Sequence, residues 1–441
     1  MHMINDIELE SNKLTKINFG GGDLSSDGGL LLIKEFVRKI GFEKLLQSAF
    51  RTNDHAAFRI HSDTENLMQR IYQILGGYTN DADADELRTD PVFKAVLEKD
   101  SLASQPTMSR FFNRLDENSL DQFEAIHRAM RKIIYSIEAP LQLIFDLDST
   151  LLATYGKQIG AGFNYHYQSH GYHPLLCFDS VTGDLLKVEL RDGTHYCGNG
   201  AADFLKSLLE EYKELLPNVP IFLRGDSGFA FPDLYEMAEE HFCSYAIRLK
   251  ANSVLYTLAA DITAKLDELT EKNKVDYAVT YGEFLYQAGT WSKERRVACK
   301  VEKPAGQFVY MYTFVVTNMD RPVEEVVQFY CKRGLMENFI KEGKNGFDFS
   351  CMSSHSKVVN AGRLQICMLA YNLFNWFKRL VLPQHFRKMQ IGTIRLKLLK
   401  IAARTVRKAR YLYFRLCSSC PYQGEFYETL QNIWRLIPKL E

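Results

Sequence analysis

Acidic residues end two apolar segments of this chain that have the composition of β-strands. The segments FDLDST and LRGDSG place Asp146, Asp148 and Asp226 at or near strand ends, where open α/β sheets form their sites. Two carboxylates about 4 Å apart repel each other by roughly 1–4 kcal/mol. A divalent cation removes that repulsion, and a site with oxygen ligands alone suits Mg²⁺ or Mn²⁺. The pattern therefore predicts a metal site at the ends of these strands.

The same aspartates have structural alternatives. Asp146 and Asp148 are two residues apart, so they point to the same side of a strand. A carboxylate in an apolar strand is costly unless it is paired or bound to a cation. Ion pairs with Arg224 or Arg191, or capping of a helix by the aspartates, would meet this requirement without a metal. The sequence leaves open whether Asp146 shares the ligand role of Asp148.

A third acid occurs in the stretch YCKRGLMENFIKEGKNGF, which spans residues 330–347. Four of its polar residues share a helical spacing: Tyr330, Arg333, Glu337 and Lys344. Their offsets of 0, 3, 7 and 14 fall within about 60° of one face if the segment is a single helix. A stripe of one acid, two bases and a phenol is unsuited to a core. We expect it to face a charged partner.

The chemistry that this stripe suggests is phosphoryl transfer on a nucleic acid. Glu337 would supply the third carboxylate of the metal site. Arg333 would contact phosphates bidentately and Lys344 as a point charge, while Tyr330 would offer its hydroxyl or its ring. In a two-metal mechanism one ion activates water or a 3′-hydroxyl, and the other stabilises the leaving oxygen. Glycines beside Lys344 weaken the helix, so we expect it to end near that residue.

The elements that must position these residues follow from the hydrophobic period. Residues 1–135 read mainly as helix, and strand-like and helical segments then alternate, which predicts an α/β core with a mixed sheet. The core strands are expected over residues 141–150, 164–181, 184–193, 219–229 and 243–252. After a short helical stretch, residues 276–318 are β-rich, and helices are expected from 322 to the end. A β-rich piece is thus inserted before the helix that carries Glu337.

Length and charge bound the possibilities. The 441 residues are too many for one ordinary core, so two or three domains are expected. The 54 Lys and Arg balance the 54 Asp and Glu, which argues against a uniformly basic coat for nucleic acid. Residues 387–415 nevertheless carry ten Lys or Arg and no acid. This basic block is either a phosphate-binding surface or a solvated helix face.

Cysteine usage and apolar segments indicate a cytoplasmic protein without membrane association. The nine cysteines are an odd number and mostly scattered, which suits a reducing compartment. Cys417 and Cys420 have C-x-x-C spacing, but no second such pair or His pair for zinc lies near them. No signal peptide is apparent. Residues 366–377 contain two Asn and are expected to form a buried helix rather than a membrane span.

Taken together, these motifs resemble a known family, the bacterial insertion-sequence transposases of the DDE type, whose catalytic core is ribonuclease-H-like. One subgroup carries a Y-x2-R-x3-E-x6-K signature, and this chain matches all four positions downstream of its DST and DSGF acids. The segments GGYTNDADADELRTDPVF, LASQPTMSRFFNRL and GFNYHYQSHGYHPLL are similar to one branch of that subgroup. The resemblance covers residues 20–380.

The resemblance implies an activity and a set of site residues. The activity is cut-and-paste DNA transposition of an insertion sequence, with Mg²⁺- or Mn²⁺-dependent cleavage at terminal inverted repeats and strand transfer to target DNA. The catalytic, metal-binding acids would be Asp148, Asp226 and Glu337, holding two ions. Double-stranded DNA would be the partner. The resemblance further implies a homodimer that cleaves in trans, a hairpin on the element end, and a nucleoid-associated location in a bacterial cytoplasm.

These considerations divide the chain into five segments. They are an α-helical DNA-binding region (1–135), a first part of the core (136–252), a β-rich insertion (253–320), a completion of the core with the Glu helix (321–380) and a basic helical region (381–441). In relatives, a Trp of the insertion can stack on a flipped base. Trp291 is the candidate for that DNA contact here, and ordinary burial is its alternative.

Rival functions use the same residues differently. A metal-dependent nuclease or resolvase would share the core but lack strand transfer. A DNA-binding protein that has lost catalysis would not need the three acids. A zinc-dependent regulatory protein would rely on Cys417 and Cys420. The four matches to the signature favour the transposase.

Overall fold

The computed structural model describes residues 6–56, 58–273, 276–307 and 309–439. The chain divides into two compact units, each built from discontinuous segments. The sheet unit consists of Glu138–Lys341 and Phe349–Leu364. The helical unit consists of Met1–Ile137, Glu342–Asp348 and Gln365–Glu441.

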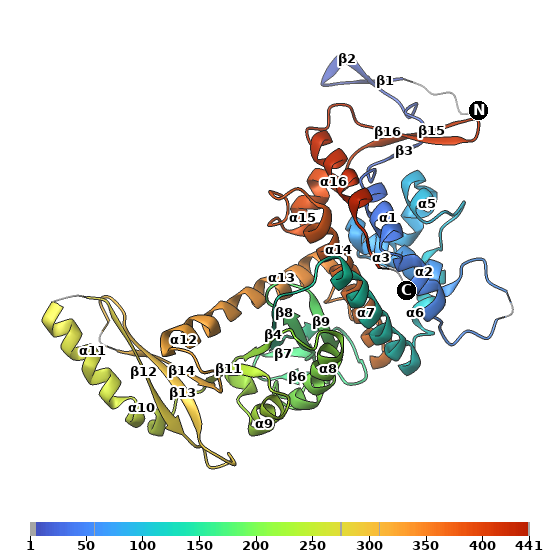
Figure 1. Ribbon diagram of the computed structural model, residues 1–441. Coiled ribbons are helices and arrows are strands. Elements are labelled where there is room, and N and C mark those ends of the chain that lie inside the picture. Colours follow the sequence, from blue (N-terminus) through green and yellow to red (C-terminus); the bar gives the residue numbers. More distant parts are fainter. Residues whose placement is uncertain (1–5, 57, 274–275, 308, 440–441) are drawn as a thin grey trace. The chain divides into compact units, whose positions relative to one another are not determined.

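The described residues of the sheet unit form an eight-stranded mixed sheet with the order β12-β13-β14-β11-β10-β4-β8-β9 (Figure 1). Its strands are β4 (Leu143–Ser149), β8 (Leu175–Asp179), β9 (Leu185–Glu189), β10 (Ile221–Gly225), β11 (Ser244–Leu249), β12 (Ala278–Tyr286), β13 (Arg295–Lys303) and β14 (Met311–Thr317). Strands β4, β10 and β11 run parallel, whereas β8 and β9 pair antiparallel. If the core strands β4, β8, β9, β10 and β11 are numbered 1 to 5 in chain order, their order across the sheet is 3-2-1-4-5. This is the ribonuclease-H-like order, and it confirms the expected fold class.

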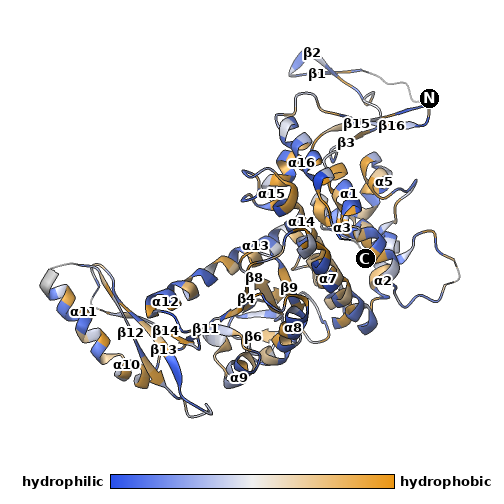
Figure 2. Ribbon diagram, viewed as in Figure 1, coloured by the Kyte–Doolittle hydropathy of each residue, from blue (hydrophilic) through white to orange (hydrophobic). Residues whose placement is uncertain are grey.

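Burial on both faces explains the apolar composition of the central strands. In β4, Leu143 and Phe145 on one face and Ile144 and Asp146 on the other face are all buried, as expected for a sheet that helices cover. Figure 2 shows the hydrophobic character of β4 and β8. Helix α8 (Ala201–Leu215) connects β9 to β10, and helix α9 (Pro232–Glu240) connects β10 to β11. Proline in the first turn of α9 suits a position whose N–H has no helical partner.

The β-rich insertion extends the core sheet. Helices α10 (Ser253–Leu258) and α11 (Ala260–Asn273) precede strands β12, β13 and β14, and β14 pairs antiparallel with core strand β11. Helix α12 (Val323–Cys331) then packs on this part of the sheet through Val326, Val327 and Tyr330. A small sheet of β5 (Leu152–Ala153), β6 (Gly162–Asn164) and β7 (Ser169–Tyr172) lies elsewhere in the unit.

Helices make up most of the helical unit. They are α1 (Leu30–Lys39), α2 (Phe42–Ala49), α3 (Asp63–Gly76), α4 (Asp83–Glu86), α5 (Pro91–Val96), α6 (Gln105–Phe112), α7 (Glu117–Ile137), α15 (Ile391–Ile394) and α16 (Gln423–Arg435). Helices α13 (Leu335–Phe347) and α14 (Lys357–Val381) contribute residues to both units. Near the N-terminus, β1 (Ile7–Leu9) pairs with β2 (Asn12–Ile17). No helix of the described residues is long and apolar enough to cross a membrane.

The expectation of a wholly helical C-terminal region is wrong. Strands β15 (Ala403–Lys408) and β16 (Tyr411–Leu416) form an antiparallel hairpin inside the basic block. Strand β15 also pairs with β3 (Leu24–Ser25). The two segments alternate polar residues with β-branched or aromatic ones, and pairing on a pleated surface suits such side chains better than a helix.

A buried ion pair joins the first two parallel strands of the core. The Nε and Nη2 atoms of Arg224 on β10 donate to the two carboxylate oxygens of Asp146 on β4, both at 2.6 Å. The side chains are only 1% and 0% exposed. The Nη1 atom of Arg224 also donates to the carbonyl oxygen of Phe329 on α12, at 2.7 Å. Asp146 is therefore occupied by the ion pair, and its partner is Arg224 rather than Arg191.

We expect Asp146→Ala to lower the free energy of unfolding by about 3–5 kcal/mol, because it leaves the Arg224 charge buried and unpaired. Chemical denaturation followed by circular dichroism would measure this loss. As a matched control, Asp192→Ala removes the more exposed ion pair with Lys357 and should cost about 1 kcal/mol or less. Equal losses in the two variants would contradict the structural role of Asp146.

Candidate active site

Asp148 and Asp226 lie side by side at the ends of two neighbouring parallel strands. Leu147 of β4 is in register with Gly225 of β10, so the residues that follow them occupy equivalent positions. The side chain of Asp148 is 15% exposed, and that of Asp226 is 40% exposed. The structure thus brings together two of the three acids predicted from the sequence.

Arg333 supplies a cation between these two carboxylates. Its Nη1 atom lies 3.3 Å from Asp148 Oδ2, and its Nη2 atom lies 3.6 Å from Asp226 Oδ2. The arginine side chain is 13% exposed. The guanidinium of Arg333 therefore lies between the two carboxylates and interacts with both.

Burial and like charge set the protonation of Asp148. Desolvation raises the pKa of Asp148 to about 6, Arg333 opposes the shift, and the charges of Asp226 and Glu337 add to it. Burial and a neighbouring carboxylate both disfavour the ionised form of a carboxyl group and so raise its pKa. An additional cation at this position would lower the pKa again.

Asp226 has a second, structural role. Its Oδ1 atom accepts a hydrogen bond of 2.8 Å from the backbone N–H of Gly228 and caps the 3₁₀ turn Ser227–Phe229. The capping alternative considered from the sequence is therefore confirmed for this residue. Because the cap uses Oδ1, the Oδ2 atom remains directed at Arg333.

Glu337 reaches the site electrostatically rather than by direct contact. It stands in the first turn of α13, is exposed and raises the pKa of Asp148 through its charge. Among the described residues, no three His, Cys, Asp or Glu side chains lie close enough to hold a metal ion. The donor set of three carboxylates nevertheless fits Mg²⁺ or Mn²⁺ chemically.

The predicted single helix through the signature residues is interrupted. Helix α12 ends at Cys331, a 3₁₀ turn spans Lys332–Gly334, and α13 begins at Leu335. Arg333 lies in that turn. The tighter winding of a 3₁₀ turn changes the angular spacing between residues before and after it.

The signature residues outside the acid pair have different surroundings. Tyr330 is only 8% exposed and belongs to a core cluster with Val315 and Val326, while its hydroxyl interacts with Arg333. Lys344 is half-buried on α13, in the short segment that belongs to the helical unit. The helix continues to Phe347, so it does not end near Lys344 as expected.

Trp291 of the insertion packs against core helix α9 as well as against the insertion itself. It is 7% exposed, and its ring centroid lies 5.3 Å from those of Tyr235 and Tyr286 in edge-on geometry. The Arg295 guanidinium lies 5.6 Å from the same ring. These contacts favour the ordinary burial of Trp291 over stacking on a DNA base.

Sequence reasoning did not single out Tyr167, which lies beside the acid pair. Its hydroxyl donates to the carbonyl oxygen of Ser149 at 3.3 Å. Burial, and then the charges of Asp148 and Asp226, raise the pKa of Tyr167 to about 12. A phenol that stays protonated is a hydrogen-bond donor near the acids. The aromatic and histidine run NYHYQSH around it is the signal that the sequence offered.

A ribonuclease-H-like sheet with aspartates at the ends of two adjacent parallel strands, and a glutamate on a following helix, defines the DDE class of enzymes. The family model described as "Transposase DDE domain group 1" matches residues 7–438. The chain belongs to this family, and it is a DDE transposase.

Solved structures give a more distant likeness. A piggyBac transposase synaptic complex with hairpin DNA is 13% identical, with a TM-score of 0.43, and the match covers 84% of this chain and 80% of that one. A Mos1 transposase paired-end complex is 12% identical, with a TM-score of 0.18, covering 46% and 64% of the two chains. No curated protein matches this chain significantly.

We expect Asp148→Asn to stabilise the metal-free protein at pH 8. The folded-state pKa of about 6 exceeds the usual value near 3.9, so the carboxylate destabilises the fold by about 2–3 kcal/mol at any pH above 6. That penalty disappears below about pH 4, where both states are protonated. Thermal unfolding with a chelator present should therefore show a higher Tm for the variant at pH 8 and no gain at pH 4. A gain that persists at pH 4 would contradict the cost of burying the ionised carboxylate as the cause.

Proposed function

We propose that this transposase carries out cut-and-paste movement of an insertion sequence. It would cleave DNA at the terminal inverted repeats and join the freed 3′-hydroxyl to target DNA. The observation that carries the proposal is the convergence of Asp148 and Asp226 on one cation, Arg333, at the strand ends of a ribonuclease-H-like sheet.

The acid pair supports a metal-dependent mechanism. Asp148 and Asp226 would hold Mg²⁺ or Mn²⁺ together with Glu337, whose charge already acts on Asp148. When bound, two such ions supply Lewis acidity to the attacking and leaving oxygens of an in-line displacement. Burial raises the pKa of Asp148 most, and the charges of Asp226 and Glu337 add to it, so a divalent cation would offset the cost of keeping this carboxylate ionised.

The protein's own cations would position the DNA. Once the carboxylates are neutralised by bound metal, the Arg333 guanidinium would turn its bidentate donors to a phosphate. The half-buried Lys344 would contact a phosphate as a point charge. Tyr330 would act on Arg333 through its hydroxyl, since its ring is enclosed by the core. A direct base contact by Trp291 would require its aromatic cluster to open.

The assembly would be a homodimer that cleaves in trans and forms a hairpin on the element end. These features rest on the family to which the chain belongs. Size-exclusion chromatography with light scattering, with and without an element-end duplex, tests the dimer. If the measured mass corresponds to one chain both with and without the duplex, the dimer is contradicted.

We expect Asp148→Asn, Asp226→Asn and Glu337→Gln each to reduce nicking of an element-end duplex by roughly 10³-fold or more, because each removes a metal ligand worth several kcal/mol in the transition state. A labelled duplex of the terminal repeat joined to flanking DNA, incubated with Mg²⁺ and resolved on a denaturing gel, measures this. DNA binding should persist in all three variants.

Glu325→Gln is the matched control, because Glu325 is an exposed acid on α12 that is outside the proposed site. It should nick at the wild-type rate. Nicking by the wild type without joining of the 3′ end to a second duplex would favour a nuclease or resolvase. Binding without any cleavage would favour a DNA-binding protein that lacks catalysis.

A further inference from the structure

The hairpin of β15 and β16 is a strongly positive segment of the described chain. Residues 403–416 include five cations and no acid: Arg404, Arg407, Lys408, Arg410 and Arg415. Within the part of the chain that the structure describes, no carboxylate forms a salt bridge with any of them. Cations elsewhere, such as Arg224 and Arg295, are paired with acids. The hairpin therefore presents charge that the fold itself does not neutralise.

The pairing register sorts the hairpin side chains into two faces. Directly paired residues point to the same face of a sheet, and the next pair points to the other. The pairs on one face are Arg404 with Arg415, Val406 with Tyr413, and Lys408 with Tyr411. We call this set the cationic face. The other face carries Ala403, Thr405, Arg407, Leu412, Phe414 and Leu416.

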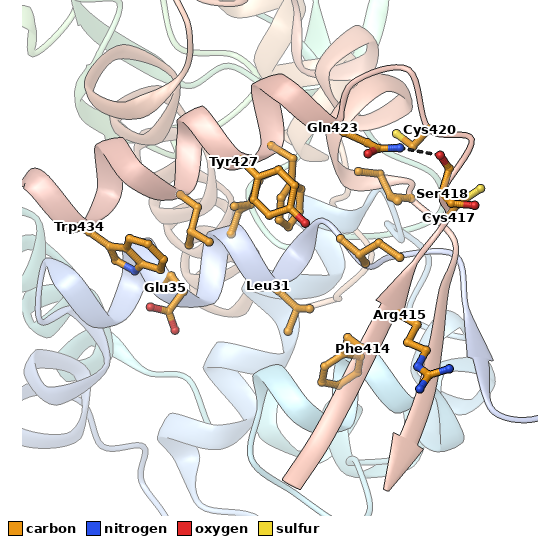
Figure 3. A pocket seen from close by; sticks show the side chains of 15 residues that line it. Leu31, Glu35, Phe414, Arg415, Cys417, Ser418, Cys420, Gln423, Tyr427 and Trp434 are labelled. Carbon is orange, nitrogen blue, oxygen red and sulfur yellow. Dashed lines mark hydrogen bonds between the residues drawn. The ribbon is translucent and has the colours of Figure 1, made fainter. Parts of the chain in front are cut away.

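The second face is the one attached to the helical unit. Ala403 is buried, and Phe414 and Leu416 are half-buried. Phe414 and Leu416 line an apolar cavity together with Leu31 of α1 and Tyr427 of α16 (Figure 3). Arg415 also borders this cavity. The cationic face is more open, because Arg404, Lys408 and the two tyrosines are exposed.

The cationic face has features that folding alone does not favour. Arg404 and Arg415 stand directly opposite each other, and like charges in that position destabilise a hairpin. Tyr411 and Tyr413 are 55% and 46% exposed, with ring centroids 6.1 Å apart. Such a surface is expected where a polyanion neutralises the charge.

We propose that the cationic face binds the phosphate backbone of double-stranded DNA, with the hairpin lying in a major groove. This inference rests on the proposed function, and it assigns a DNA contact to the helical unit. Arg404 and Lys408 are four residues apart on one strand, or about 13 Å. The major groove is about 12 Å wide and admits a two-stranded β-ribbon. Two cations at this spacing on a strand that runs with the groove would contact separate phosphates along it.

The tyrosines fit the same partner. Their hydroxyls lie on the same face as the cations, where they can donate to phosphate or sugar oxygens. The contacts are to the backbone, so we expect binding to be independent of DNA sequence.

The test compares full-length variants in their binding to a random-sequence duplex and to an element-end duplex over a range of salt concentrations. The double variant Arg404→Gln with Lys408→Gln should weaken binding to both duplexes. It should reduce the slope of log K against log salt by about 1.8, since each phosphate contact contributes about 0.9. The charge-preserving double variant Arg404→Lys with Lys408→Arg should keep the wild-type slope, which excludes misfolding as the cause.

Arg407→Gln is the matched control, because it removes the same charge from the opposite face of the same hairpin. It should leave the slope unchanged. An unchanged slope in the Gln double variant, or an equal loss per charge in Arg407→Gln, would overturn the proposal. If the wild-type protein nicks the element end and the Gln double variant binds DNA as tightly as the wild type, the hairpin contact is rejected but the proposed catalysis is not. Salt-dependent binding through the hairpin without any nicking would reject the proposed catalysis alone.

Discussion

The buried ion pair between Asp146 and Arg224 is the interaction on which the rest of the site depends. It joins β4 to β10, and through the carbonyl oxygen of Phe329 it also holds α12. Two residues further along each strand, on the same side, stand Asp148 and Asp226. A pair of opposite charges in the interior therefore aligns the two strands, and a pair of like charges lies at their ends.

The same ion pair determines where the cation of the site comes from. Because Arg224 holds the end of α12, the 3₁₀ turn that follows places Arg333 over the two carboxylates. The helix carrying Glu337 begins directly after that turn. One side chain in the core thus positions an arginine and an acid that are more than a hundred residues away in sequence.

The proposed chemistry and the proposed DNA-binding charge lie in different units. The acids and Arg333 belong to the sheet unit, whereas the hairpin of β15 and β16 belongs to the helical unit. Within each unit the reason is local: the acids need partial burial to interact strongly, and backbone-binding cations need exposure. The balanced net charge of the chain conceals this division.

Sequence alone determined the central part of this protein. Alternation of apolar strands and helices predicted the mixed sheet, because these periods follow from backbone geometry. Asp148, Asp226, Glu337 and Arg333 were identified from residue type, order and spacing. Their roles in catalysis and metal binding stay predictions.

Tertiary structure decided what depends on partners distant in sequence. It selected Arg224 rather than Arg191 for Asp146, because Arg191 instead donates to the carbonyl oxygens of His173, Cys197 and Asn199. It enclosed Trp291 and Tyr330, whose burial no local pattern specifies. It also made a hairpin within residues 387–415, where charge suggested a helix face. Charge is compatible with either conformation, whereas strand pairing requires a partner that only the folded chain provides.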